Sequence, residues 1–259
     1  MSRSLDALVA RAHRLAIGGR RYHPYFLATD VAVVVSLAAA FALIRRHGNI
    51  SFLGFVAVYA TMLALYRGFL WFKARVFGIQ SRSFLQDSVL FLLPAYALVC
   101  RLAGYPLAFA FDLTAVILPI FGGFARIGCF LGGCCYGVPS AHGVLYPAHI
   151  FQPVDGCRRF RPGADPGTRV MPTQLIESAG LFVIGAAIFD AEWTGASPPG
   201  AGMPVFLLSY SALRFGVDFY RRSSARPRIG RFSEAQVFAL IVAAVSVVLL
   251  VVLAARAPA

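Results

Sequence analysis

The sequence predicts an all-α integral membrane protein, with about seven transmembrane helices and an N-terminal amphipathic helix lying on the membrane surface. Of its 259 residues, 59% are hydrophobic and only 14% are charged, whereas soluble domains are about half apolar and about a quarter charged. The apolar residues gather in runs close to the roughly 20 residues that a helix needs to cross a bilayer. Because these runs are continuous and do not alternate with polar residues, they favour helices over a membrane β-barrel.

The same composition excludes several other classes of protein. So many apolar residues exclude a disordered or collagen-like chain, and 5 Cys in 259 residues exclude a disulfide-rich secreted module. The net charge of +13 does not indicate a nucleic-acid partner, because the apolar excess needs a bilayer to bury it. All but one of the 24 basic residues are Arg. In a membrane protein, Arg marks topology and the anionic lipid surface, or it forms a functional site.

Residues 1–24 form the predicted surface segment. Apolar residues recur there at helical spacing with Arg between them, and Gly18-Gly19 ends the pattern. This pattern is typical of a helix that lies in the plane of the membrane interface. No uninterrupted apolar core follows the basic residues at once, so we do not expect a cleavable signal peptide.

Residues 25–259 form one predicted membrane domain without an internal repeat. Its apolar runs are 25–44, 51–71, 84–100, 107–135, 173–190, 203–220 and 235–254. The last run has no charged residue, whereas the short run 173–190 contains Glu177. The long segment 136–172 is rich in Pro, Gly and Arg, and we expect it to form a small extramembrane cap.

Most of the basic residues lie on one predicted side of the membrane. They fall in the segments 1–24, 72–83, 136–172 and 221–232. The positive-inside rule would place this side, and the N-terminus, in the cytoplasm. The alternative is that this face is basic because it handles anionic phospholipid headgroups. Both interpretations stay open at this point.

Charged residues inside the apolar runs are candidates for a functional site, since each costs on the order of 3 kcal/mol near the bilayer centre. These residues are Asp30, Arg67, Asp87, Asp112, Arg126, Glu177, Arg214 and Asp218. Following each run from its starting side places all of them except Arg67 and Asp112 on the Arg-rich face, and Arg67 lies near it. Arg214 and Asp218 are four residues apart and can form an ion pair, and Tyr210 lies one turn earlier. These residues either hold helices together or line a pocket for an anionic headgroup, and their convergence favours the pocket.

A glycine- and cysteine-rich segment follows Arg126 directly. Two steps of small residues, Gly128–Gly132 and Gly133–Gly137, allow a helix or a ligand to approach the backbone closely. The planar guanidinium of Arg126 is suited to bidentate phosphate binding. It would face a groove with little side-chain bulk.

The same segment contains three of the five cysteines: Cys129, Cys134 and Cys135. They can be small apolar packing residues, or one can be a reactive thiol activated by Arg126. Two downstream histidines, His142 and His149, could complete a metal site, but the spacing contains no Cys-x-x-Cys and fits no standard zinc pattern. We therefore expect no bound metal, and nothing in the sequence indicates an organic cofactor.

At these residues the chain resembles the prolipoprotein diacylglyceryl transferase family, over about 110–255. The family signature, Gly-Arg-x-Gly-Asn-Phe followed by Asn-Gly-Glu and a later Gly, is matched by Arg126, Gly128, Phe130, Gly133 and Gly137. The block 172–177 is similar to the family's Pro-Ser-Gln-Leu-Tyr-Glu, and 210–219 to its Tyr-x-x-x-Arg-x-x-x-Glu-Phe. The block 233–236, Ser-Glu-Ala-Gln, is similar to the start of the family's last helix.

The resemblance implies an enzyme of the bacterial cytoplasmic (inner) membrane, with many membrane passes. It would move the diacylglyceryl group of phosphatidylglycerol onto the thiol of a prolipoprotein cysteine and release glycerol phosphate. Arg126 and Arg214 would hold the phosphodiester and stabilise charge on the leaving phosphate, while Tyr210 and Glu177 would orient the catalytic site. The residues implied to line the substrate are Gly128, Cys129, Gly133, Gly137, Gln174, Gln86, Asp87 and Asp218.

The chain departs from the family pattern on the side of the acceptor. Cys129 and Gly132 stand where the signature has Asn, and Cys134 stands where it has Glu. Members usually have His-Gly-Gly at the start of the third membrane helix, implicated in proton handling. Gln86 in the place of that His cannot act as a base at neutral pH, whereas the adjacent Asp87 can.

Three functional hypotheses result. The first is an enzyme with phosphatidylglycerol, or another anionic phospholipid, as donor and a prolipoprotein cysteine or a related group as acceptor. The second is a non-catalytic phospholipid-binding protein on the same fold, supported by the missing His. The third is a thiol-linked membrane redox protein, supported only by the three cysteines. The side of the membrane that the pocket faces bears on the first hypothesis. The acceptor cysteine of a prolipoprotein (the lipobox cysteine) is exported, so a pocket that faces the cytoplasm cannot reach it.

Overall fold

The fold is all-α, as expected. The computed structural model describes residues 2–12, 16–17, 20–21, 23–48, 50–77, 85–147, 167–221 and 228–256. The helices in these ranges are α1 (Ser2–Ala12), α2 (Pro24–His47), α3 (Phe52–Phe77), α4 (Leu85–Leu102), α5 (Leu107–Leu131), α6 (Thr173–Thr194), α7 (Gly202–Asp218) and α8 (Glu234–Arg256). Helices α2 to α8 correspond one to one with the seven apolar runs, so the prediction of an all-α membrane protein is confirmed.

Not every run is long enough to cross a bilayer as a regular helix. Five described helices are long and apolar enough to do so: α2, α3 over Phe52–Phe69, α5, α6 and α8. The run with Glu177 is one of them, because α6 continues to Thr194 and has 22 residues. Helix α7 has 17 residues and ends with Arg214 and Asp218 in its last turns. The count of seven full spans is therefore not established, although the multi-pass architecture is.

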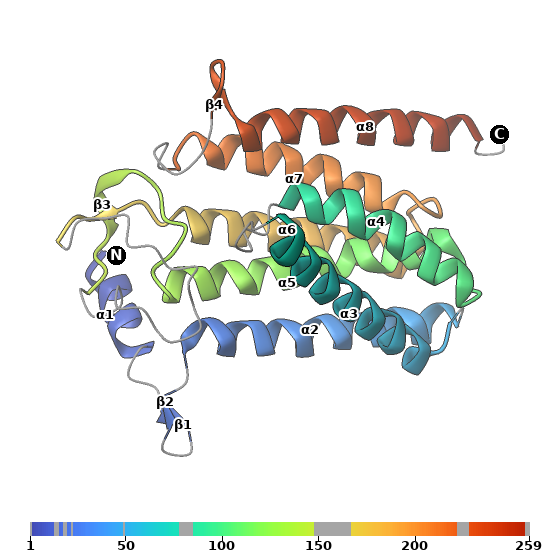
Figure 1. Cartoon of the computed structure of the whole chain (residues 1–259), viewed down its shortest axis with the longest axis horizontal. Coiled ribbons are helices and arrows are strands. Elements are labelled where there is room, and N and C mark those ends of the chain that lie inside the picture. The colour runs from blue at the N-terminus through green and yellow to red at the C-terminus, as the bar shows by residue number, and fades with distance from the viewer. Residues whose placement is uncertain are drawn as a thin grey trace.

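The helices form a bundle along the long axis of the molecule (Figure 1). Helix α5 is central, because it packs against α2, α6 and α7, while α8 packs against α7 at the edge of the bundle. Helices α3 and α4 contact each other and cross the front of the bundle in this view. Helix α1 lies at the same end as the C-terminal end of α5 and the N-terminal end of α6, and the C-terminus lies at the opposite end.

The strands in the described ranges are short and lie in the segments between helices. Strand β1 (Ala16–Ile17) pairs antiparallel with β2 (Arg20–Arg21), and β4 (Arg228–Ile229) pairs antiparallel with β5 (Phe232–Ser233). Strand β3 (Pro139–Val144) belongs to the predicted cap and forms isolated bridges with Val170. The remainder of the cap, residues 148–166, lies outside the described residues.

The core of the bundle forms where α5 meets its neighbours. Leu113 and Val116 of α5 are almost fully buried and pack with apolar residues of α2, α3, α6 and α7. Small residues permit the closest contacts: a Cβ added to Gly128 would lie 3.1 Å from the ring of Tyr25 and 3.2 Å from Ala28 Cβ. The predicted close approach at Gly128 is therefore made by a helix, α2.

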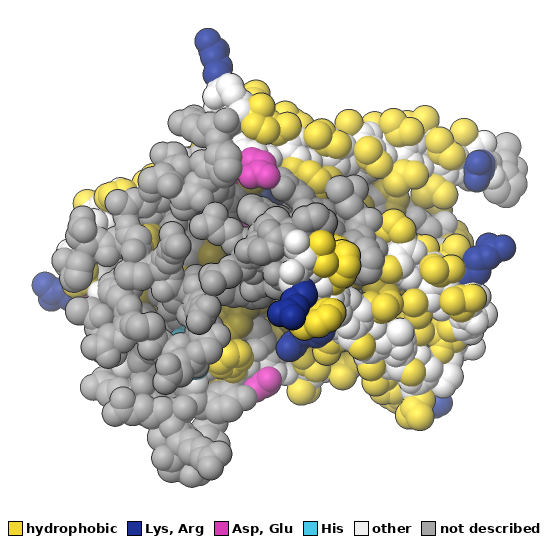
Figure 2. All heavy atoms as spheres, viewed as in Figure 1, with side chains coloured by type: hydrophobic (Ala, Val, Ile, Leu, Met, Phe, Trp, Pro, Cys, Tyr) yellow, Lys and Arg dark blue, Asp and Glu magenta, His cyan; other side chains and the backbone are white. Residues whose placement is uncertain are grey.

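The outer faces of the helices are apolar. Hydrophobic side chains cover most of the described helical surface in Figure 2. On α8, Val248 and Val251 are more than half exposed. A soluble protein rarely exposes a contiguous apolar surface of this kind, so these faces are suited to contact with lipid chains.

Helix α1 is docked on the cap. Val9 is fully buried in a cluster with Tyr136, Val144 and Tyr146. Asp6 accepts a hydrogen bond of 2.8 Å from the backbone N–H of Leu145 and pairs with Arg169 at 2.7 Å. One apolar face of α1 thus rests on protein, and the position of this helix on the membrane surface stays a prediction.

Candidate functional site

A carboxylate with no exposed surface, Glu177, is the centre of the candidate site. It lies in the second turn of α6, and its neighbours Thr173 and Gln174 are also fully buried. Pro172 is the N-cap of this helix, where its missing backbone N–H removes no intrahelical hydrogen bond. The beginning of α6 therefore inserts these polar side chains into the protein, between the ends of α5 and α7.

Four side chains surround the carboxylate of Glu177. Arg126 Nη2 lies 2.9 Å from Oε1, and the hydroxyl of Tyr210 donates to the same oxygen at 3.0 Å. Arg221 Nη2 lies 2.8 Å from Oε2, and Arg214 Nη1 lies 4.0 Å from it. The predicted convergence of Arg126, Glu177, Tyr210 and Arg214 is therefore observed.

The ion pair between Arg214 and Asp218 is present as predicted, with 3.1 Å between Nη2 and Oδ1. Asp218 also accepts a short hydrogen bond from the hydroxyl of Ser233. Ser233 and Gln236 form a capping box at the start of α8: Gln236 N donates to Ser233 Oγ at 3.1 Å, and Ser233 N donates to Gln236 Oε1 at 3.0 Å. The site is thereby connected to the N-terminus of α8.

Arg221 is a member of the cluster that the sequence analysis did not select. It follows the end of α7 and is placed by a small backbone ladder. Val138 N donates to Tyr220 O at 2.9 Å, and Gly137 N donates to Met171 O at 2.9 Å. A Cβ at Gly137 would clash with the carbonyl oxygen of Tyr220, so glycine is required for this close approach.

The three guanidinium groups differ in accessibility. The side chain of Arg126 is 22% exposed, whereas those of Arg214 and Arg221 are 9% and 7% exposed. The buried Nε of Arg221 has no hydrogen-bond partner among the described residues. Burial, together with the charges of Arg126 and Arg214, lowers the pKa of Arg221. The cluster therefore has capacity for an additional anionic group.

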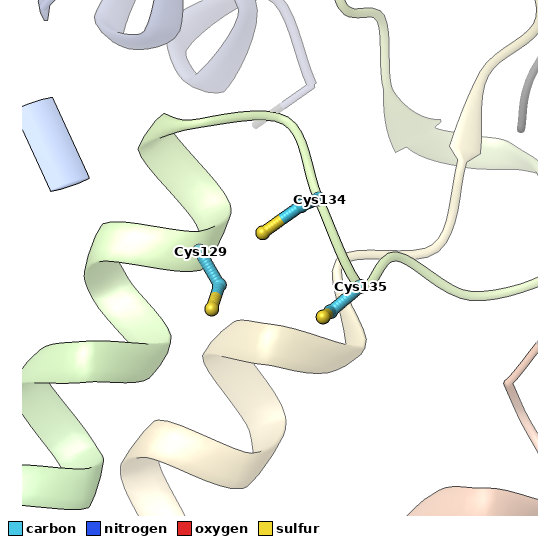
Figure 3. A group of neighbouring side chains, drawn as sticks. All are labelled: Cys129, Cys134 and Cys135. Atoms are coloured by element: carbon cyan, nitrogen blue, oxygen red, sulfur yellow. The ribbon is translucent and has the colours of Figure 1, made fainter. Parts of the chain in front are cut away.

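The glycine- and cysteine-rich segment forms a tight turn beside this cluster. Gly133 has a φ of 69°, in the left-handed region. The amide of Gln174 donates to Cys134 O at 2.6 Å. Cys129 lies in the last turns of α5, and its sulfur faces those of Cys134 and Cys135 (Figure 3).

Other residues selected from the sequence lie apart from the cluster or outside the described side chains. Asp112 accepts two backbone N–H hydrogen bonds, of 2.6 and 2.8 Å, at the start of α7. Asp30 and Arg67 are exposed on α2 and α3. The side chains of Gln86 and Asp87 lie outside the described residues, so their roles stay predictions.

The fold and the cluster define a class of protein: a polytopic α-helical membrane protein with a buried Arg–carboxylate site at one end of its bundle. Comparison with known proteins identifies the family within this class. The family model described as prolipoprotein diacylglyceryl transferase matches residues 86–252, which include every member of the cluster. The chain belongs to this family.

Curated relatives are similar to this chain over about half of its length. A phosphatidylglycerol–prolipoprotein diacylglyceryl transferase 2 of Clostridium perfringens is 31% identical over 135 residues, covering 51% of this chain and 46% of the relative. The phosphatidylglycerol–prolipoprotein diacylglyceryl transferase of Clostridium tetani is 27% identical over 147 residues, covering 55% and 53%. That of Xanthomonas axonopodis pv. citri is 31% identical over 160 residues, covering 57% and 52%. The chain thus spans about half the length of these relatives.

Proposed function

We propose that this protein is a diacylglyceryl transferase of the bacterial cytoplasmic (inner) membrane. Its donor is phosphatidylglycerol or another anionic phospholipid, and its acceptor is the thiol of a prolipoprotein cysteine or a related group. The observation that carries the proposal is the cluster of three guanidinium groups around one buried carboxylate, in which Arg221 Nε has no hydrogen-bond partner within the part of the chain that the structure describes. The names of the curated relatives support phosphatidylglycerol as donor.

The differences in exposure suggest how a phosphodiester binds. Arg126 is the most exposed of the three, so its guanidinium meets the headgroup first. Arg214 and Arg221 lie deeper and complete the contact with the phosphate oxygens. Glu177 and Tyr210 hold the guanidinium planes in place, which reduces the reorganisation needed when charge develops.

The proposed reaction is a displacement at the carbon of the diacylglyceryl group that carries the phosphate oxygen. The acceptor thiol loses its proton to a base, and its sulfur forms a C–S bond as the C–O bond to the phosphate breaks. The electron pair of that bond leaves with the phosphate as glycerol phosphate. Arg126, Arg214 and Arg221 stabilise this additional negative charge, which is the contribution that the cluster makes to the rate.

Headgroup release from labelled phosphatidylglycerol tests the proposal. The full-length protein in detergent or liposomes is incubated with this lipid and a thiol-containing acceptor peptide. Substitution of Arg126 or Arg214 by Ala is expected to lower release by roughly 10²–10³-fold. Arg101→Ala, at the exposed end of α4, is the matched control and should retain activity. Normal turnover in both cluster variants would overturn the site assignment.

The alternative function, non-catalytic phospholipid binding, is favoured by Gln86, which stands where the family usually has a His. The same assay separates the two functions. Binding of phosphatidylglycerol without headgroup release, with every acceptor tried, would establish the binding protein and eliminate the transferase.

The acceptor also depends on orientation, which a reporter fused after the C-terminus measures. The cluster lies at the end of the bundle opposite the C-terminus (Figure 1). A cytoplasmic C-terminus therefore places the cluster toward the outer face of the membrane, where exported lipobox cysteines are available. A C-terminus on the outer side would exclude a prolipoprotein acceptor.

A further inference from the structure

Three cysteine sulfurs meet beside the Arg cluster. The sulfur atoms of Cys129, Cys134 and Cys135 all lie within 4.8 Å of one another. Cys129 comes from α5, and the other two come from the turn that follows it (Figure 3). All three are free cysteines.

The turn is held in the conformation that brings these sulfurs together. Its backbone is in the left-handed region at Gly133, with a φ of 69°, and again at Cys135, with a φ of 61°. The left-handed conformation costs a non-glycine residue roughly 1–2 kcal/mol. Unfavourable backbone geometry persists only where the surrounding structure determines it, and it is typical of binding sites.

The start of α6 supplies that surrounding structure. Gln174 Nε2 donates to Cys134 O at 2.6 Å, and Thr173 Oγ1 donates to Cys135 O at 3.3 Å. Cys134 N donates in turn to Cys129 O at 3.0 Å, which joins the turn to the last turn of α5. Each cysteine backbone is thus fixed by a hydrogen bond.

We propose that Cys129, Cys134 and Cys135 bind one zinc ion through three thiolates. In a tetrahedral site with Zn–S bonds of about 2.3 Å, neighbouring sulfurs are about 3.8 Å apart. The sulfurs need to move by roughly 1 Å or less to reach this geometry. Three protein ligands leave the fourth tetrahedral position open to an exogenous ligand, as in zinc sites that take part in catalysis.

The charges around the sulfurs are consistent with this assignment. Three thiolates and one Zn²⁺ carry a net charge of about −1. The guanidinium groups of Arg126 and Arg221 interact electrostatically with Cys135. They offset this negative charge, so the site does not leave an uncompensated anion in a poorly solvated region.

The spacing along the chain concealed the site. Cys-x-x-x-x-Cys-Cys contains no Cys-x-x-Cys and matches no standard zinc pattern, which is why the sequence analysis expected no metal. The ligand set is formed by the end of one helix and the turn after it, and this arrangement is apparent only in three dimensions.

Metal binding by the full-length protein in detergent tests the proposal. The protein is stripped with a chelator, returned to reducing buffer and titrated with Zn²⁺ or with Co²⁺ as a spectroscopic probe. We expect one equivalent of ion per chain and a strong thiolate-to-cobalt charge-transfer band. Cys129→Ser, Cys134→Ser and Cys135→Ser should each weaken binding by at least roughly tenfold, because each removes one ligand.

Cys100 provides the matched control. It is fully buried between α4 and its neighbours, in a cluster with Val58, Tyr96 and Ala110. Cys100→Ala should bind zinc as the unmodified protein does. Thermal unfolding of each metal-free variant shows whether the variant is folded.

Two results would overturn the zinc site. The first is substoichiometric binding at micromolar zinc by the folded, reduced protein. The second is binding that survives all three cluster substitutions in folded variants. Neither readout involves lipid turnover, so failure of the zinc site leaves the transferase proposal intact, and the reverse holds as well.

Discussion

Replacing Glu177 by Gln removes the one negative charge that all three guanidinium groups share. Its carboxylate lies 2.9 Å from Arg126, 2.8 Å from Arg221 and 4.0 Å from Arg214, with no exposed surface. The substituted side chain would keep the shape and one acceptor oxygen, but its amide nitrogen is a donor and would face the donors of the guanidinium groups. Loss of one partner from a buried ion pair typically costs about 3–5 kcal/mol.

This cost is measurable as a change in thermal stability. For a chain of this size, 1 kcal/mol corresponds to roughly 2–4 °C in melting temperature, so Glu177→Gln should lower it by about 10 °C. Intrinsic tryptophan fluorescence in detergent follows the unfolding. Asp190→Asn is the matched control, since Asp190 is exposed on the same helix, and it should change stability by less than about 0.5 kcal/mol.

A double-mutant cycle makes the test stricter. In Glu177→Gln/Arg221→Gln, one of the unpaired cations is removed together with the anion. The double variant should therefore be more stable than the sum of the two single effects, with a coupling of about 1–3 kcal/mol. Additive effects, or a Glu177→Gln protein as stable as the unmodified one, would refute the idea that the carboxylate compensates the cluster.

Three further predictions concern the elements that position the site. Gly137→Ala places a Cβ in conflict with the carbonyl oxygen of Tyr220 and should destabilise the fold by more than about 2 kcal/mol in thermal unfolding. Gly216→Ala on α7 is the control: no atom of the described residues would lie within 4 Å of its Cβ, so it should be neutral or slightly stabilising. Ser233→Ala removes the hydroxyl that accepts from Gln236 N in the capping box and donates to Asp218, and a loss of about 1–2 kcal/mol is expected in the same assay. An unchanged melting temperature would contradict the capping role. Asp6→Asn weakens the attachment of α1 to the cap by about 1–3 kcal/mol, so limited proteolysis should release the N-terminal segment faster than from the unmodified protein.

The helices and part of the site could be predicted because their signals are local. Continuous apolar runs give membrane helices, and the four-residue separation of Arg214 and Asp218 places them on one helix face. Tyr210 follows from the same periodicity. Arg126 and Glu177 could be added because helices that start or end on the same side bring such residues to the same depth.

Arg221 could not be found in this way. It lies beyond the last turn of α7, in a basic stretch that is equally well explained by topology or by anionic lipid. Its position depends on the antiparallel bridge to Gly137, which joins residues 84 positions apart. No periodicity within one segment reveals a contact of that sequence separation. The meeting of the three cysteines was concealed for a different reason. These residues are close in the sequence, but their contact depends on the conformation of the turn after α5.

The backbone bridge between Gly137 and Arg221 also bears on the order in which the protein is assembled. Arg126 and Glu177 are synthesised well before Arg221, so the carboxylate first meets a single Arg while the chain still lacks α7. The second close ion pair to Glu177 forms only when α7 has been inserted and residue 221 has returned to the turn after α5. Contacts between distant segments carry the largest loop-closure cost and form late. The site is therefore completed near the end of synthesis, and nascent chains that stop within α7 hold an incomplete cluster.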